Sequence, residues 1–409
     1  MRGILKMERR DFLKLSGGLC LLAPFSSCRE ISRELPPDIK ITRIVGFDLF
    51  CRRNKVVGKN AVRDVHGSQA RERMIRIYTN ANIDGIGHCR AGEKAAAQML
   101  GRNLKELYDI QSNRMPGTFG AGTMALWDLA GKVAGKPVYE LLGAKGSKKV
   151  GVYDGSIYFA DLLPEHEHSW RNRFRQEIDM AMLLGHRAFK VKIGRGHKWM
   201  PWEVGYARDK EVLEVIRRHA GPKVVIGVDS NNGYTLKKAK QLLMDLPDYN
   251  FAFVEEMFPE LLDRCLEFKD FIKAHDWKTL VADGESGRAV EFYKPFIEAR
   301  AIDICQADMR QFGIDGIMNI AALCKEKDIL MAPHNWGSLM GYYMQLHIGR
   351  AISNFYRAEH DPVTTDVIAT EGYSMKKGYA TVPAAPGFGL KVIENKFTSE
   401  VKIRFDIKL

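Results

Sequence analysis

The sequence of 409 residues lacks the features that mark several classes of protein. It has no Cys-x-x-Cys pair, and its seven cysteines do not follow metal-ligand spacing. Outside the N-terminal region, no stretch is long and apolar enough to span a bilayer. There is no low-complexity tract and no short repeat of the solenoid kind. These absences argue against zinc-ribbon, membrane-spanning and solenoid proteins, and they favour buried thiols over a disulfide framework.

A concentrated basic segment is also missing, although the formal net charge is +12. Residues 1 to 34 alone hold seven Lys or Arg against four Asp or Glu. The remaining excess is spread along the chain without aromatic interleaving or a nucleic-acid-binding motif. We therefore expect no nucleic-acid partner, and we interpret the charge as favouring solubility and the attraction of acidic substrates.

The N-terminus carries a predicted export signal. Arg9 and Arg10, followed by a modest apolar run over residues 15 to 25, resemble a twin-arginine export signal within residues 1 to 34. The residues leading to Cys28 resemble a lipoprotein processing site, so a lipid anchor at Cys28 is the one predicted membrane contact. We expect an exported protein, periplasmic or membrane-anchored, with a cytoplasmic protein as the alternative.

The first part of the remaining chain predicts an α+β unit. Strand patterns cover residues 41–51, 74–79 and 85–89, and helical patterns cover 93–107 and 120–134. The charged, aperiodic residues 55–71 between the first two strands predict a mobile loop.

After residue 149, eight short apolar runs alternate with helical patterns, which predicts a parallel α/β barrel. No clear amphipathic helix follows the eighth run. The fold class is therefore α/β, a modified (β/α)7β TIM-like barrel with an N-terminal α+β capping domain completed by the C-terminal tail. The predicted boundaries are 35–149 together with 385–409 for the capping domain, and 150–384 for the barrel.

Two lysines in the second barrel strand indicate where chemistry is possible. Lys190 and Lys192 are two residues apart and therefore share one face of the strand. Mutual repulsion and burial would lower the pKa of a lysine toward the range of a catalytic base. The alternative is a surface strand with two solvated lysines.

Polar residues stand at the ends of the following six strands as well. Successive positions are 23 to 37 residues apart, close to one strand and helix each. The carboxyl ends of barrel strands meet at one mouth, which is where such barrels hold their active sites. The residues concerned are Asp229, Glu255, Glu285, Asp308, His334 and Glu359.

Three of these residues predict a metal site. Asp229, Glu255 and Glu285 on adjacent strands supply oxygen ligands only, which suits Mg²⁺. The alternative is three acids paired with basic residues at the rim. Asp308 and His334, on neighbouring strands, predict a carboxylate that orients and charges an imidazole.

These motifs together resemble the enolase superfamily, mandelate racemase subgroup, with an acid-sugar dehydratase-like character. The match includes the Lys-x-Lys strand, the three acids, the Asp308 and His334 dyad and the Pro-Gly-Phe-Gly segment at residues 386–389. The resemblance covers residue 40 to the C-terminus. It implies Mg²⁺-dependent removal of the proton α to a carboxylate, through an enediolate.

The resemblance also implies individual roles. Lys192 would be the base on one face of the substrate, with Lys190 as its electrostatic partner, and His334 would serve the other face. Asn231 would contact the substrate. Glu359 would donate a hydrogen bond to the carboxylate, or else form a salt bridge at the rim.

Dehydration of a sugar acid to a 2-keto-3-deoxy acid is the expected reaction. A racemase or epimerase of a 2-hydroxy acid is the alternative, and a non-catalytic sugar-acid binding protein is a remote one. The capping loop 56–69 and the loop 194–202 are expected to close over the mouth. In the second loop, Arg195, His197 and Lys198 are predicted substrate ligands or solvated side chains. The family resemblance implies a homo-oligomer.

Overall fold

The computed structural model describes residues 35–36, 38–107, 115 and 119–409. The predicted export signal and Cys28 lie outside these residues. In the described ranges, no helix has the length and hydropathy needed to cross a membrane. The five described cysteines are free and buried, as predicted.

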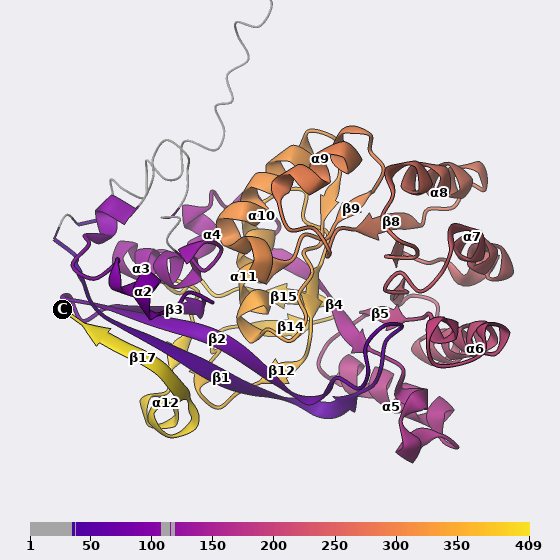
Figure 1. Cartoon of the computed structure of the whole chain (residues 1–409), viewed down its shortest axis with the longest axis horizontal. Coiled ribbons are helices and arrows are strands. Elements are labelled where there is room, and N and C mark those ends of the chain that lie inside the picture. The colour runs from indigo at the N-terminus through magenta and orange to yellow at the C-terminus, as the bar shows by residue number, and fades with distance from the viewer. Residues whose placement is uncertain (1–34, 37, 108–114, 116–118) are drawn as a thin grey trace, which may run out of the picture.

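An antiparallel sheet forms the capping unit (Figure 1). Its strands are β1 (Ile41–Val57), β2 (Gly67–Thr79), β3 (Asp84–His88), β12 (Val363–Thr364) and β17 (Lys402–Lys408). Strand β1 pairs with β2 along one side, and with β17 and then β12 along the other. The C-terminal strand therefore completes the capping sheet, as the sequence predicted.

Three short elements lie on this sheet: α2 (Glu93–Ala97), the 3-10 turn η1 (Leu104–Leu107) and α3 (Met124–Ala134). Helix α4 (Val138–Leu141) packs against α3. Helix α3 packs so closely on β3 that a Cβ at Gly85 would lie 2.2 Å from the carbonyl oxygen of Ala125. The predicted helix over 93–107 is wrong in its middle. Gly101 adopts a positive φ of 74° there, and Asn103 bridges to Lys40, so the chain turns back to the sheet.

The long β1 and β2 hairpin reaches from the cap to the barrel (Figure 1). The predicted loop over 55–71 is therefore too long, since pairing extends to Val57 and Gly67. The strand pattern was not visible in the sequence, because Arg53 and Lys55 point inward although they are charged. Arg53 forms a buried ion pair with Asp361 at 2.6 Å, and Lys55 one with Glu177 at 2.7 Å.

Eight parallel strands form the barrel. They are β4 (Lys149–Ile157), β5 (Ala188–Lys192), β6 (Val225–Asp229), β7 (Phe253–Glu255), β8 (Leu280–Asp283), β9 (Ile304–Cys305), β10 (Leu330–Met331) and β11 (Ala358–His360). Each strand from β4 to β10 pairs with its neighbour, and β11 pairs with β4. A bridge between Met331 and Phe355 closes the ring. All eight predicted strands are confirmed in order.

Helices surround this barrel (Figure 1). They are α5 (Trp170–Leu183), α6 (Trp202–Ala220), α7 (Leu236–Asp245), α8 (Leu262–Ala274), α9 (Val290–Glu298), α10 (Met309–Lys325) and α11 (Leu339–Ala351). Four 3-10 turns lie in the connections: η3 (Ala160–Leu162), η4 (Pro164–His166), η5 (Arg195–His197) and η6 (Pro247–Tyr249).

The segment after β11 contains short strands instead of an eighth barrel helix. They are β12 and then β13 (Ile368–Ala369), β14 (Ser374–Lys376), β15 (Tyr379–Thr381) and β16 (Lys391–Val392), followed by α12 (Glu394–Glu400). The barrel from β4 to β11 is fully described, and its eight strands and seven helices confirm the (β/α)7β prediction.

Side chains of β5 point alternately into and out of the barrel, and this alternation places the two lysines inside it. Ala188 packs with the small cluster inside the barrel, while Phe189 and Val191 belong to the main core outside it. Lys190 and Lys192 therefore point inward, and they are only 1% and 3% exposed. The solvated-strand alternative for the two lysines is wrong.

Candidate active site

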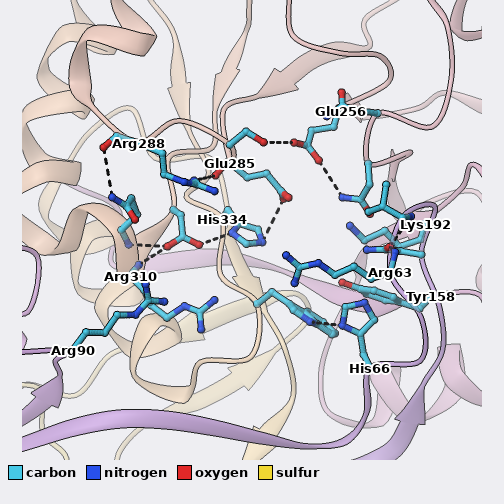
Figure 2. A pocket seen from close by; sticks show the side chains of 18 residues that line it. Arg63, His66, Arg90, Tyr158, Lys192, Glu256, Glu285, Arg288, Arg310 and His334 are labelled. Atoms are coloured by element: carbon cyan, nitrogen blue, oxygen red, sulfur yellow. Dashed lines mark hydrogen bonds and ion pairs between the residues drawn. The ribbon is translucent and has the colours of Figure 1, made fainter.

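A cavity of about 610 Å³ lies between the capping loops and the carboxyl ends of the barrel strands. Its wall combines residues of the cap with residues that follow β4 to β10 (Figure 2). Among the predicted site residues, those that line it are Lys192, Asn231, Glu285, Asp308 and His334.

The three predicted metal ligands come together at one side of this cavity. Carboxylate oxygens of Asp229, Glu255 and Glu285 all lie within 4.8 Å of one another. Asp229 and Glu255 are fully buried. The Oε2 atom of Glu285 is buried without a hydrogen bond in the described structure, and it has an ion-pair contact with His334 Nε2 at 3.4 Å. Three converging carboxylates, one of them with an oxygen that accepts no hydrogen bond, are a donor set that suits Mg²⁺.

Two ammonium groups neutralise part of this acidic cluster. Lys190 Nζ lies 2.6 Å from Glu255 and 3.3 Å from Asp229, and Lys192 Nζ bonds to Asp229. Burial raises the pKa of Asp229, but the two lysines lower it more, so the net direction is down. Burial raises the pKa of Glu255, and the charge of Asp229 adds to this effect.

The expected lowering of the lysine pKa is wrong for the protein without metal. Burial does lower the pKa of Lys192, and Lys190 adds to this, but the nearby Asp229 carboxylate raises it above the usual value. Repulsion between the lysines is real but smaller than attraction to the acids. Sequence spacing revealed the neighbouring lysine, whereas the acids come from other strands.

Asp308 and His334 form the predicted dyad. Asp308 caps the N-terminus of α10, where Oδ1 accepts the backbone N–H groups of Arg310 and Gln311, each at 2.8 Å. Its Oδ2 accepts from His334 Nδ1 at 2.7 Å. Nε2 of His334 is therefore the nitrogen left for other partners, and it lies 3.4 Å from Glu285. Burial lowers the pKa of His334, but Glu285 and Asp308 raise it to about 9.

Asn231 lines the cavity, and its buried Oδ1 has no partner among the described residues. Its Nδ2 donates to Glu256 at 3.0 Å, and its backbone N–H donates to Asp229 at 2.8 Å. Glu256 also lines the cavity, and burial with the nearby Glu285 raises its pKa well above the usual value. Sequence reasoning missed Glu256, although it directly follows a predicted metal ligand.

Glu359 and Lys190 lie behind the cavity wall and do not line it. Glu359 Oε1 is 2.7 Å from Lys190 Nζ, and its Oε2 accepts the backbone N–H of Asn335 at 2.8 Å. Both side chains are 1% exposed. The structure contains a salt bridge at Glu359, as in the predicted alternative, but it is buried behind the cavity wall and not at the rim. The hydrogen bond to a substrate carboxylate stays a prediction.

Arg195 requires a correction. Its guanidinium is fully buried and forms ion pairs with Asp161 at 2.7 Å and Asp209 at 2.6 Å. His197 is exposed, and neither residue lines the cavity. The predicted substrate contact of Arg195 is wrong because its guanidinium meets acids of other segments at η5. The exposed His197 is consistent with the solvated alternative.

The loop that contains these residues supports the capping loop instead. Trp199 Nε1 donates to the carbonyl oxygen of Asn60 at 2.6 Å, and Lys198 Nζ donates to that of Val62 at 3.1 Å. The capping loop itself contacts the cavity, as predicted, through Asn60, Val62, Arg63 and His66.

An aromatic group on the wall was also missed. Tyr158, His66 and Trp336 pack together, with ring centroids of Tyr158 and Trp336 4.6 Å apart. The Tyr158 ring lies 5.2 Å from Lys192 Nζ. The sequence placed these residues at a strand end, in a cap loop and next to His334, but offered no signal that they meet.

Fold and cavity together define a metal-dependent barrel enzyme equipped to move protons. Residues 173–396 match the family model described as enolase C-terminal domain-like. The chain belongs to the enolase superfamily, in the mandelate racemase and muconate lactonizing subgroup.

Two curated relatives illustrate the similarity. An arabinonate dehydratase from Saccharolobus solfataricus is 30% identical over 279 residues, which cover 67% of this chain and 69% of that protein. A D-galactonate dehydratase family member from Pseudarthrobacter chlorophenolicus is 28% identical over 371 residues, covering 78% and 89%.

Solved structures agree with this assignment. A galacturonate dehydratase from Geobacillus sp., complexed with D-galacturonate and 5-keto-4-deoxy-D-galacturonate, has a TM-score of 0.84 at 28% identity. The alignment covers 91% of this chain and all of that one. A mutant of a galacturonate dehydratase from Geobacillus sp., complexed with Mg, has a TM-score of 0.83 at 29% identity, covering 89% and 96%. The donor set and this relative both indicate Mg²⁺ as the cofactor.

Proposed function

We propose that the protein dehydrates a sugar acid to a 2-keto-3-deoxy acid. The observation that carries this proposal is that Lys192 and His334 line one cavity beside the three-carboxylate cluster. The names of the relatives support the same class of reaction. The identity of the sugar acid is a separate question.

Asp229, Glu255 and Glu285 would hold Mg²⁺. When bound, the ion supplies positive charge that polarises the substrate carboxylate and stabilises the enediolate. Lys192, as the neutral amine, takes the proton from C2. Lys190 does not line the cavity and lies beside Asp229 and Glu255, so we assign it the role of holding positive charge next to these acids.

His334 provides the acid for the second step. The C3–O bond breaks, and the departing hydroxide takes the proton from Nε2 to form water. Asp308 fixes Nδ1–H, so Nε2 is the nitrogen that delivers the proton. The resulting enol tautomerises to the 2-keto-3-deoxy acid. Each turnover converts one sugar acid into one keto acid and one water molecule.

The test is a screen of purified protein with Mg²⁺ against aldonates, uronates and aldarates in D₂O. We expect a keto acid from at least one substrate, and losses of about 10² to 10⁴ in rate for Lys192→Met and His334→Asn, the usual range for general acid–base catalysis. His334→Asn should still exchange the C2 proton, because Lys192 is intact.

Other outcomes identify the alternatives. Deuterium entry with inversion and no keto acid would establish a racemase or epimerase, for which Lys192 and His334 are also suitably placed. Binding without any exchange would establish a sugar-acid binding protein. Full exchange by Lys192→Met would contradict the role assigned to Lys192.

We also propose that the protein is exported, on the basis of Arg9, Arg10 and the apolar run that follows. Replacing both arginines by lysine should retain the protein in the cytoplasm in a fractionation experiment, and Cys28→Ala should release any lipid-anchored form. Equal distribution of parent and variants would contradict export by this signal. Homo-oligomerisation stays a prediction.

A further inference from the structure

Three arginine side chains on the cavity wall form no ion pair in the described part of the chain. Arg63 and Arg90 form neither a side-chain hydrogen bond nor an ion pair there, and the Nε atom of Arg310 is buried without an acceptor. Other inward-facing arginines are neutralised, such as Arg53 by Asp361 and Arg195 by Asp161. Arg63 and Arg90 are exposed and Arg310 is half-buried, so their guanidinium groups give one side of the cavity a positive charge that no ion pair neutralises. Positive charge gathered in a cleft attracts an anionic ligand.

The three arginines come from different segments that converge on the cavity. Arg63 lies in the turn between β1 and β2, Arg90 follows β3, and Arg310 lies in the first turn of α10. In Figure 2, Arg90 and Arg310 lie across the cavity from Lys192 and Glu256, with His334 between the two sides. The Arg63 side chain projects from the cap into the middle of this space.

Arg288 also lines the cavity, but its guanidinium is engaged. Its Nη1 donates to the carbonyl oxygens of Glu285 and Gly287, each at 3.1 Å. These bonds hold the loop that presents Glu285. We therefore leave Arg288 out of the ligand-binding set.

We propose that Arg63, Arg90 and Arg310 form a subsite for a second anionic group of the substrate. This inference rests on the proposed function, in which the first carboxylate lies beside Asp229, Glu255 and Glu285. Guanidinium groups recognise carboxylates through paired, charge-assisted hydrogen bonds. The substrate class is therefore a sugar diacid, with a carboxylate at both ends, in preference to a monoacid with a terminal hydroxymethyl group.

The experiment compares substrates that differ at the far end only. The panel pairs galactarate with galactonate and galacturonate, glucarate with gluconate, and gluconate with 6-phosphogluconate, all with Mg²⁺ and detection of keto acid. We expect kcat/KM for the diacid to exceed that of its matched monoacid at least tenfold, which is about 1.4 kcal/mol. The ratio should fall at high ionic strength, because salt screens the arginines.

Arginine variants test which side chains cause the preference for the diacid. Arg63→Ala, Arg90→Ala and Arg310→Ala should each lower the diacid to monoacid ratio, and the triple variant should bring it near one. Arg218→Ala is the matched control, since it removes the same charge from an exposed position on α6. Equal kcat/KM for diacid and monoacid in the parent would overturn the subsite and leave the dehydratase proposal standing. A preference for the phosphorylated acid over the diacid would overturn the diacid assignment.

A binding measurement tests the subsite even if the protein proves not to be a dehydratase. If no acid gives keto acid or proton exchange, binding is measured by the shift in melting temperature with Mg²⁺ and each acid. A larger shift with galactarate than with galactonate, lost in the triple variant, would support the subsite without catalysis. Equal shifts in parent and triple variant would overturn it.

Discussion

The indole N–H of Trp336 donates a hydrogen bond to Nδ1 of His66 across 3.1 Å. Because an indole nitrogen only donates, Nδ1 must be the acceptor, and the proton of the neutral ring is on Nε2. Burial lowers the pKa of His66 to about 4, and Lys192 and Arg53 add to this effect. His66 is therefore a neutral donor on the cavity wall, and its Nε2 is buried without a partner in the described structure.

This relationship predicts that His66 donates to a substrate oxygen. His66→Phe should raise KM and lower kcat/KM about tenfold, the value of one net hydrogen bond of about 1 kcal/mol or slightly more. His66→Gln keeps an N–H donor and should retain more activity. Trp336→Phe should lie between them, because it frees the tautomer without removing the ring. Equal kinetics for the Phe and Gln variants would contradict this role.

Arg195 should behave as a stability residue. Arg195→Met leaves Asp209 buried without its counter-charge and Asp161 with Arg208 alone, which costs about 3 to 5 kcal/mol. We expect a large fall in melting temperature, measured by calorimetry with and without Mg²⁺. His197→Ala is the control in the same turn and should melt like the parent. An unchanged melting temperature with a raised KM would restore the substrate-binding role.

Mg²⁺ should stabilise the folded protein. Binding to the folded state alone contributes about 2.7 kcal/mol at a free concentration 100 times Kd. We expect the melting temperature to rise with Mg²⁺ and to return on addition of EDTA. Glu285→Gln should reduce the rise, because it removes a charged ligand while leaving the buried Asp229 and Glu255 in place. A rise of the same size in this variant would show that the ion binds elsewhere.

Acid should destabilise the fold through His347. Its Nδ1 accepts the backbone N–H of Tyr139 at 3.2 Å, and its Nε2 lies 2.8 Å from the hydroxyl of Tyr373. Burial lowers its pKa to about 3 in the folded state, against about 6.5 when unfolded. The contribution is present above pH 6.5 and is lost as the pH falls toward 3. Between pH 7 and pH 5 we expect a loss of about 2 kcal/mol.

Denaturant titrations at the two pH values measure this loss. His347→Gln cannot titrate and should lose correspondingly less stability over the same interval. Burial also lowers the pKa of His360 to about 3, so part of the pH dependence should remain in the variant. The same pH dependence in parent and variant would contradict the assignment to His347.

The placement of Asp229, Glu255 and His334 could be predicted because a barrel brings consecutive strand ends to one mouth. Regular spacing along the chain was therefore enough to locate them. The full length of the first capping strand could not be predicted, because it depends on contacts between residues distant in the sequence. Arg53 pairs with a residue 308 positions away, so its burial has no local signature. The inward arginine made a strand resemble a charged loop.

The same limit applies within the site. Arg195 and Arg63 both belong to basic loops near the mouth, and nothing in their neighbouring residues distinguishes them. Their different environments depend on whether Asp161 and Asp209 lie within reach, which only the folded chain decides. Lys192 shows the limit for electrostatics. Its neighbour on the strand was visible in the sequence, whereas the stronger influence of Asp229 comes from the adjacent strand.

The buried pair of Arg53 and Asp361 fastens the β1 strand to the segment after β11, next to the turn that carries Arg63 and His66. The anchoring residue and the residues that line the cavity are thus separate residues of one hairpin. Changes in the turn can alter what the cavity accepts while the anchor keeps the turn in position. With the substrate contacts proposed for Arg63 and His66, we expect substitutions in the turn to change the substrate range at little cost in fold stability.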